Sequence, residues 1–164
     1  MAYRNKTYVC FDGDEDIHYY RLMQAWKSNK GIEFNFADAH DLNTARDSSQ
    51  EESIKRQLRS RFANSKLLVV LVGEKTKNLR KFVQWEMEVA IKLGLPIIAA
   101  NLDGSLNQTS RTPATIRDRL VLHVPFSQKA LHHAMSIWPT KHLELERKQI
   151  EAPYVFSQKF IDEL

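Results

Sequence analysis

One long aliphatic run constrains the fold of this chain more than any other feature. It covers residues 65–73 and reads Ser-Lys-Leu-Leu-Val-Val-Leu-Val-Gly. A short β-branched and aliphatic run that ends in glycine is typical of a strand covered on both faces, because a half-exposed strand would alternate with polar residues. The run therefore predicts the central strand of a sheet with helices on both faces.

Four other segments show strand patterns, and helix-forming segments separate them along the chain. These strands are expected at residues 6–11, 32–36, 96–102 and 120–125. Consecutive strands joined by short helical crossovers form one parallel sheet with helices on both faces. The sequence therefore predicts an α/β, flavodoxin-like three-layer fold with a five-stranded parallel sheet.

The edges of this sheet are predicted from the weakest strand patterns. Residues 32–36 alternate strictly between apolar and polar side chains, as a half-exposed strand does. Residues 120–125 end in Pro125, which has no amide hydrogen to donate to a neighbouring strand. With the aliphatic run at the centre, the expected strand order is 2-1-3-4-5.

Capping and stop residues predict the positions of the helices. We expect them over residues 17–29, 48–64, 78–93 and 112–119, and from Ser127 to a stop at Pro139. The expected division of the chain follows from this last stop. An α/β domain would cover residues 1–139, and a C-terminal helical extension and tail, packed on the domain or extending from it, would cover residues 140–164.

The bulk properties are those of an ordinary globular protein. A chain of 164 residues with 43% hydrophobic and 27% charged residues suits one domain with a core. No apolar run reaches membrane-spanning length and the first residues do not resemble a signal peptide, so we expect a cytoplasmic protein with no membrane partner. The net charge of +4 comes with no nucleic-acid-binding motif, so no nucleic-acid partner is expected. Cys10, the only cysteine, is expected to be a small core residue.

An acidic loop follows the first expected strand. Asp12, Asp14, Glu15 and Asp16 place four carboxylates within five residues. Acidic residues are favoured where a helix starts, because the free amides and the helix dipole attract negative charge. Open α/β sheets also bind their ligands at the carboxyl ends of strands. Helix capping and a cation or ligand site therefore both remain open for this loop.

The connection after the second expected strand is long and polar. It covers residues 37–47, and His40 and Asp41 are its most reactive members. Loops of this length at the carboxyl end of a sheet are often functional. The alternative is that His40 is simply solvated, since a histidine titrates near neutral pH without any functional role.

Glu86 stands out within the helix expected over residues 78–93. At 100° per residue it falls near the middle of an apolar arc that includes Val83, Met87 and Ala90. A carboxylate there must point into a cleft, find a partner or take up a proton, because burial of an unpaired charge is prohibitive. Glu86 is therefore either a structural buried acid or a catalytic one.

Other families that share this architecture lack support in the sequence. A response-regulator receiver needs an aspartate at the end of the third strand and a lysine at the end of the fifth, where this chain has Gly73-Glu74 and Val124-Pro125. A flavodoxin needs a hydroxyl-rich phosphate loop where this chain has its acidic loop, which would repel phosphate. The chain also has no Gly-x-Gly-x-x-Gly motif and no P-loop.

The order of several motifs resembles a known family. These motifs are Val9-Cys10-Phe11-Asp12, the long loop after the second strand, the Leu-Val-Val-Leu-Val strand, and Phe82-x-x-x-Glu86 followed by Gly94-Leu95-Pro96-Ile97-Ile98. Over about residues 6–138 the chain resembles a Toll/interleukin-1 receptor (TIR) domain, specifically the bacterial TIR-like group that includes the TIR proteins of Thoeris antiphage defence.

The resemblance implies an activity and a set of site residues. In enzymatic TIR domains the glutamate at this position cleaves the nicotinamide–ribose bond of NAD⁺, so Glu86 would be the catalytic residue. The implied substrate-binding residues are Phe11, Asp12, Asp14, Asp38, His40, Asp41 and Phe82. The resemblance implies NAD⁺ as a substrate with no resident cofactor or metal, self-association for activity, and a nucleotide product that reaches a separate effector protein.

Two other functions remain open from the sequence. The first is a noncatalytic TIR-like interaction module in which Glu86 is structural. The second is a metal-dependent nuclease that uses Asp12, Asp14 and Asp16.

Overall fold

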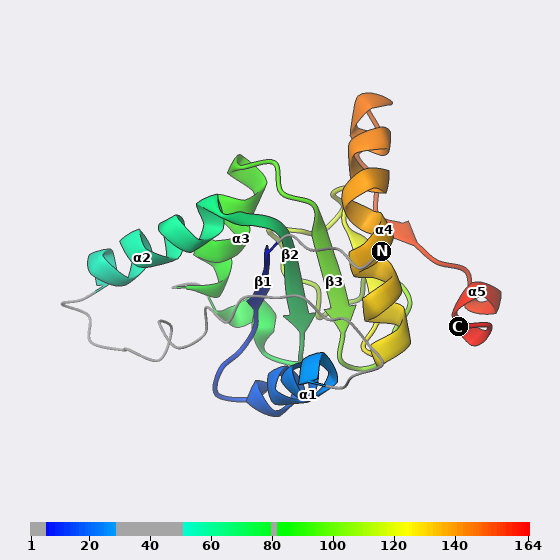
Figure 1. Cartoon of the computed structure of the whole chain (residues 1–164), viewed down its shortest axis with the longest axis horizontal. Coiled ribbons are helices and arrows are strands. Elements are labelled where there is room, and N and C mark those ends of the chain that lie inside the picture. The colour runs from blue at the N-terminus through cyan, green and yellow to red at the C-terminus, as the bar shows by residue number, and fades with distance from the viewer. Residues whose placement is uncertain (1–5, 29–50, 80–81) are drawn as a thin grey trace.

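The computed structural model describes residues 6–28, 51–79 and 82–164 (Figure 1). Its strands are β1 (Lys6–Cys10), β2 (Ser65–Val72), β3 (Ile97–Asn101), β4 (Leu122–Pro125) and β5 (Tyr154–Val155). Its helices are α1 (Ile17–Ser28), α2 (Glu51–Ala63), the 3₁₀ helix η3 (Thr76–Asn78), α3 (Val83–Lys92), α4 (Gln128–Arg147) and α5 (Gln158–Asp162). Among the described helices, none is long and apolar enough to cross a membrane.

The strands form one parallel sheet in the order β1-β2-β3-β4-β5. This confirms the predicted α/β, flavodoxin-like fold, and the pairings β1–β2, β2–β3 and β3–β4 are those expected from the sequence. The strand expected at residues 32–36 lies outside the described residues, so its place beside β1 stays a prediction. The strand β5 was not predicted, and it pairs with β4 through Tyr154 and Val155.

Two apolar cores lie on the two faces of the sheet, and β2 contributes to both. Alternate β2 side chains enter opposite cores: Leu67, Val69 and Leu71 pack with α1 and α4, and Leu68, Val70 and Val72 pack with α2 and α3. Apart from Lys66 every residue of β2 is buried. A fully buried aliphatic side chain contributes about 2 kcal/mol, so this strand dominates the core as its sequence predicted.

The chain before and within β4 differs from the prediction in two places. Residues 112–119 form successive turns instead of a helix, and the guanidinium of Arg117 donates to the carbonyl of Thr112 at 2.7 Å. Asp118 has a left-handed φ of 60°, which a continuing helix would not allow. The predicted edge position of β4 is also wrong, because β5 pairs with Leu122 and His123. Pro125 lies beyond this pairing and has only Asn101 of β3 as a strand partner.

Pro139 does not end a helix as predicted. It lies inside α4, which continues for 20 residues from its Ser127 N-cap to Arg147. A proline in a helix removes one backbone hydrogen bond and crowds the preceding turn. Burial of Trp138 before it and of Leu145 after it offsets this cost, because both side chains pack into the core shared with α1. Residues 140–147 thus continue α4, and β5 and α5 follow it (Figure 1).

His123 makes the stability of the fold depend on pH. It is fully buried on β4, and neither ring nitrogen has a hydrogen-bond partner within the described part of the chain. Burial lowers the pKa of His123 from 6.5 to about 4, because the charged imidazolium loses its hydration. The folded protein therefore resists protonation at a pH where the unfolded chain accepts a proton.

We predict that the free energy of unfolding decreases as pH falls from about 6.5 to about 4, with His123 accounting for about 3 kcal/mol of the loss. His123→Val should remove this component in urea unfolding measured across the range. His18→Gln is the control, because His18 is exposed. An unchanged pH dependence in His123→Val would contradict the assignment.

Candidate active site

Buried polar side chains gather where β1, β2 and β3 end. This carboxyl edge of the sheet holds the polar residues Asp12, Asp16, Thr76, Glu86 and Asn101, each at most 7% exposed. Ligands of open α/β folds bind outside the carboxyl ends of the strands. The buried polar groups at this edge are therefore candidates for ligand binding or catalysis.

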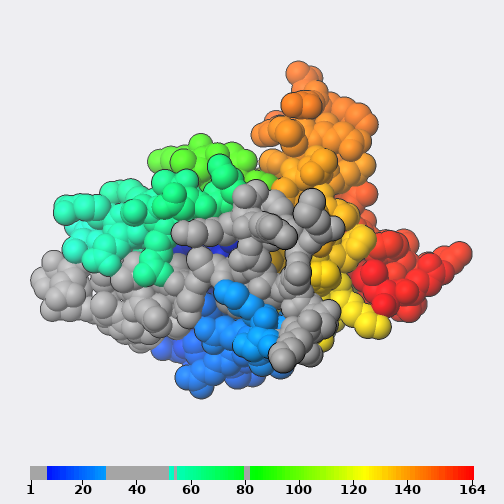
Figure 2. All heavy atoms as spheres, viewed as in Figure 1, coloured from blue at the N-terminus to red at the C-terminus, as the bar shows by residue number. Residues whose placement is uncertain are grey.

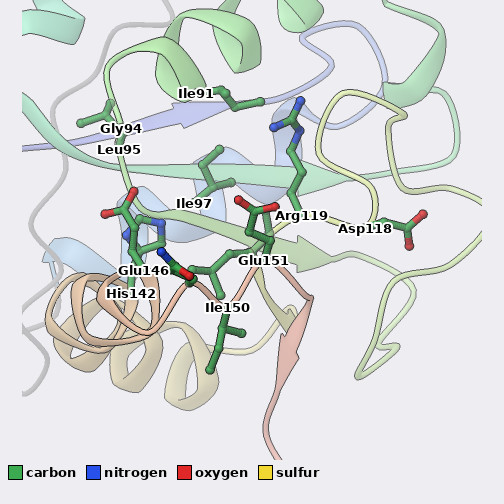
Figure 3. Close-up of a pocket in the computed structure, with 13 residues that line it drawn as sticks. Ile91, Gly94, Leu95, Ile97, Asp118, Arg119, His142, Glu146, Ile150 and Glu151 are labelled. Carbon is green, nitrogen blue, oxygen red and sulfur yellow. The ribbon is translucent and has the colours of Figure 1, made fainter.

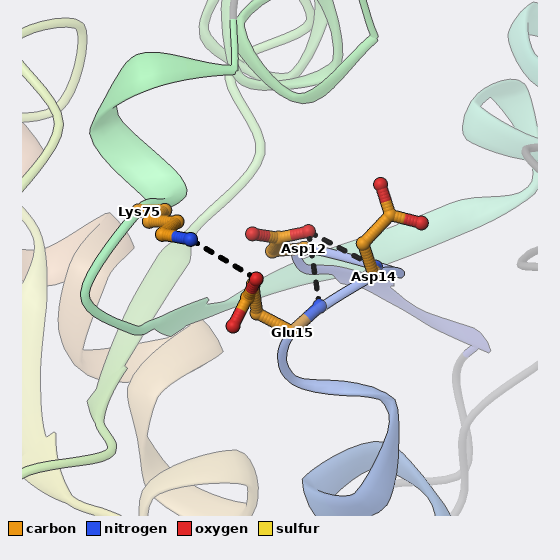
Figure 4. A network of polar contacts seen from close by, with 4 residues as sticks. All are labelled: Asp12, Asp14, Glu15 and Lys75. Carbon is orange, nitrogen blue, oxygen red and sulfur yellow. Dashed lines mark hydrogen bonds and ion pairs between the residues drawn. The ribbon is translucent and has the colours of Figure 1, made fainter.

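The acidic loop is ordered by Asp12. Its Oδ1 accepts hydrogen bonds from the amides of Asp14 at 3.0 Å and Glu15 at 3.4 Å (Figure 4). Asp12 thus stabilises the turn that precedes α1. Glu15 pairs with Lys75 at 3.1 Å, but both side chains are more than half exposed. An exposed pair of this kind contributes little to stability.

Asp16 packs directly against the end of β2. A Cβ atom built on Gly73 would lie 2.1 Å from Oδ2 of Asp16, so only glycine fits there. This Oδ2 is buried and accepts no hydrogen bond from any described residue. Burial raises the pKa of the Asp16 carboxyl, and the nearby charge of Asp12 raises it further. The acidic loop after β1 and the end of β2 are therefore in close contact at this edge through Asp16 and Gly73.

A short 3₁₀ helix carries the chain from β2 to α3. The amide of Gly73 donates to Oγ1 of Thr76 at 2.9 Å, and that hydroxyl donates to the carbonyl of Leu71 at 3.2 Å. The predicted helix start at Asn78 is wrong, because Asn78 ends η3 and α3 begins at Val83. The predicted end is confirmed, since Gly94 follows the last turn with a left-handed φ of 69°.

Glu86 lies in the first turn of α3 and is fully buried. Its amide donates to the carbonyl of Phe82 at 2.7 Å, which fixes the backbone at the helix start. Val83, Met87 and Ala90 on the same helix are also buried. This confirms that the acid stands within the apolar face of α3.

Cys10, the last residue of β1, lies against the first turn of α3. Its thiol donates to the carbonyl of Val83 at 3.8 Å. Burial raises the pKa of the Cys10 thiol well above its ordinary value, and the adjacent Glu86 carboxylate raises it further through its charge and a hydrogen bond. Cys10 therefore lies against the helix turn that carries Glu86, whereas the sequence had indicated only a core role for Cys10. Strand alternation was the available signal, because it places Cys10 and Phe11 on opposite faces.

The expected site residues do not all converge. Phe82 lies one turn before Glu86 and packs on the core shared by α2 and α3. Phe11 lies on the other face of the sheet, stacked on Tyr20 with ring centroids 4.6 Å apart. Asp14 is exposed. Asp38, His40 and Asp41 lie outside the described residues. The roles proposed for these residues stay predictions.

The acidic loop does not form a metal site within the part of the chain that the structure describes. No group of three or more histidine, cysteine, aspartate or glutamate residues there could hold a metal ion. Oδ1 of Asp12 is already used by two backbone amides. The described residues thus give no support to the nuclease alternative.

A surface groove of about 600 Å³ lies at the opposite edge of the sheet (Figure 3). Its floor includes Ile97 and Val121, which lie at the amino ends of β3 and β4. Its rim carries the charged residues Asp118, Arg119, Glu146 and Glu151. These rim residues are all exposed to solvent, unlike the buried polar residues at the carboxyl edge. The groove is therefore separate from the carboxyl edge and from Glu86.

The sequence matches one known family. A family model described as the TIR-like domain of the Thoeris protein ThsB matches residues 8–107 of the chain, which is more than half of it. The matched region runs from β1 through β3 and includes Cys10, the acidic loop and Glu86. The carboxyl edge described above is thus largely contained in the matched region, whereas β4, α4 and the C-terminal segments follow it.

The contact between Asp16 and Gly73 predicts the effect of one added methyl group. Gly73→Ala should destabilise the protein by about 1–3 kcal/mol, because the new Cβ would overlap the Asp16 carboxylate. The check is chemical denaturation of Gly73→Ala, of Asp16→Ala and of the double variant. In the Asp16→Ala background the same methyl group should cost much less. Equal costs in both backgrounds would show that the carboxylate is not what excludes a side chain.

Proposed function

We propose that this chain, which belongs to the family of the TIR-like domain of the Thoeris protein ThsB, cleaves NAD⁺ at its nicotinamide–ribose bond. The product would be a signalling nucleotide of the ADP-ribose type that acts on a separate effector protein. Self-association would be needed for activity, as the family resemblance implies. The proposal makes NAD⁺ a substrate, with no resident cofactor.

The proposed chemistry requires a carboxylate beside the ribose. The bond between the ribose C1′ and the pyridinium nitrogen breaks, and nicotinamide leaves as a neutral base with the bonding electron pair. The ribose then passes through an oxocarbenium-like state that a carboxylate stabilises by charge and by hydrogen bonds to the ribose hydroxyls. Water or a hydroxyl of the same nucleotide attacks C1′ and loses its proton, which gives a linear or a cyclic product.

The complete burial of Glu86 is the observation that carries the proposal. A charged group removed from water interacts more strongly with a developing positive charge than an exposed group does. Glu86 is 0% exposed and lies in the first turn of α3, where the chain returns from the carboxyl edge of the sheet. The fold therefore holds a carboxylate at the edge where open α/β sheets bind ligands.

A noncatalytic interaction module is the alternative, and one contact favours it. The thiol of Cys10 contacts the turn that carries Glu86 through the carbonyl of Val83, and a structural acid would have the same buried surroundings. In that case a variant at this position would lose stability and have no NAD⁺ cleavage to lose. The two functions therefore differ in what Glu86→Gln changes.

We predict that Glu86→Gln lowers the rate of NAD⁺ cleavage at least about a hundredfold, because the amide cannot supply the negative charge that the oxocarbenium-like state needs. Glu88→Gln is the matched control on the same helix. Glu88 is exposed and accepts a hydrogen bond from Gln84 at 2.9 Å, so its variant should keep the parental rate.

The measurement is nicotinamide release followed by liquid chromatography at several protein concentrations, which covers activity that depends on assembly. Circular dichroism and unfolding curves show whether each variant is folded. Turnover by a folded Glu86→Gln protein at the parental rate would overturn the assignment of Glu86. Absence of nicotinamide release from the parent at every concentration would favour the interaction module.

A further inference from the structure

The groove at the amino ends of β3 and β4 combines an apolar floor with exposed apolar side chains. Its apolar lining residues are Ile91, Leu95, Ile97, Leu120, Val121 and Ile150 (Figure 3). Ile150 is 40% exposed, and Leu93, which precedes the lining residue Gly94, is 52% exposed. Apolar surface that stays exposed around a groove and has a polar rim marks an interaction site.

The rim of this groove is acidic. Asp118, Glu146 and Glu151 are negative, and Arg119 is the positive residue among those that line it. Arg119 donates from Nε to the carbonyl of Thr115 at 2.9 Å, within its own loop. Neither Glu146 nor Glu151 forms an ion pair with a described residue. The groove therefore suits a partner that brings positive charge and apolar surface together.

Arginine has both of these properties in one side chain. Its methylene stem packs along apolar surface while its charged head stays at the rim. The guanidinium is less strongly hydrated than an ammonium group, and its planar fork matches the two oxygens of a carboxylate. Arginines exposed on a rigid element are therefore the ligand that an apolar groove with a carboxylate rim fits best.

Helix α2 presents such arginines. The stretch from residue 55 to residue 66 has no acidic residue, and its cations are Lys55, Arg56, Arg59, Arg61 and Lys66. Arg56 and Arg59 are exposed, lie three residues apart on the helix, and form no ion pair with a described residue. Arg59 lies over the ring of Trp85, with 5.5 Å between Cζ and the ring centroid. α2 thus carries guanidinium groups that are available to a partner.

The groove and α2 lie on different parts of the molecule. α2 packs through Leu58 and Phe62 on one face of the sheet, whereas α4 packs on the other face. Figure 1 shows the two helices on opposite sides of β2. No lining residue of the groove comes from α2. The two surfaces are therefore complementary in charge but can meet only between two molecules.

We infer that the groove of one copy binds the arginine-bearing face of α2 from a second copy. The inference rests on the proposed function, which includes self-association. The guanidinium groups of Arg56 and Arg59 pair with the rim carboxylates, and their stems cover the apolar floor. The two surfaces differ, so the contact is heterologous, and each bound copy keeps one surface that can bind a further copy.

Charge reversal on each surface tests the contact. The double variant Arg56→Glu/Arg59→Glu places carboxylates on α2 opposite those of the groove. The double variant Glu146→Arg/Glu151→Arg places guanidinium groups in the groove opposite those of α2. Each variant alone should associate at least about a hundredfold more weakly than the parent, because like charges face each other. An equimolar mixture should recover association, since each variant then meets a surface of opposite charge.

The measurement is the average mass by light scattering over a range of protein concentrations, with circular dichroism to show that each variant is folded. Lys129→Glu/Lys159→Glu is the matched control, because it changes the net charge equally at exposed positions outside both surfaces. It should associate as the parent does. A parent that stays monomeric at every concentration, a mixture that stays monomeric, or a control as weak as the α2 variant would overturn the inference.

Nicotinamide release separates the failure of the inference from the failure of the proposed function. If the parent cleaves NAD⁺ but the mixture of variants does not recover association, the interface falls and the activity stands. If the mixture recovers association while the parent releases no nicotinamide at any concentration, the interface stands and the proposed function falls.

Discussion

The burial of one carboxylate in an apolar helix face is the constraint on which the site depends. Removing an ionised carboxylate from water costs several kcal/mol even after the protein relaxes, so the fold must offset this cost by contacts around Glu86. The turn that holds it is fixed by the backbone hydrogen bond to Phe82 and by the Cys10 thiol that abuts it. Buried ionisable groups in such positions cluster at functional sites, and catalysis is the role proposed for Glu86.

The position of that carboxylate follows from the way β2 ends. The buried aliphatic strand delivers Gly73 to the carboxyl edge, where Asp16 lies against it so closely that no side chain fits. Thr76 then closes the 3₁₀ turn through its hydroxyl, and α3 starts only after this turn. Glu86 is thus placed by a chain of close contacts that begins in the central strand. The groove at the amino ends of β3 and β4 has no such connection with it.

The sequence was sufficient for the parts of this account that depend on local pattern. The aliphatic run predicted β2, and the helical spacing of Val83, Glu86 and Met87 predicted a buried acid. The sequence was insufficient where contacts between distant parts of the chain determine the structure. β5 is two residues long, which is too short for a pattern, and α4 passes through Pro139 because the residues on both sides are buried. The contact between the Cys10 thiol and the Val83 carbonyl depends on how α3 packs on β1, which no local spacing reveals.

The central claim is that the buried carboxylate of Glu86 meets the ribose of NAD⁺. The most direct measurement is a crystal structure of the protein with a non-cleavable NAD⁺ analogue, in which a carbon atom replaces the ribose ring oxygen. The account predicts the analogue at the carboxyl edge of the sheet, with a Glu86 oxygen within hydrogen-bonding distance of the ribose hydroxyls. An analogue bound in the groove at the amino edge, with Glu86 still enclosed by the core, would contradict it.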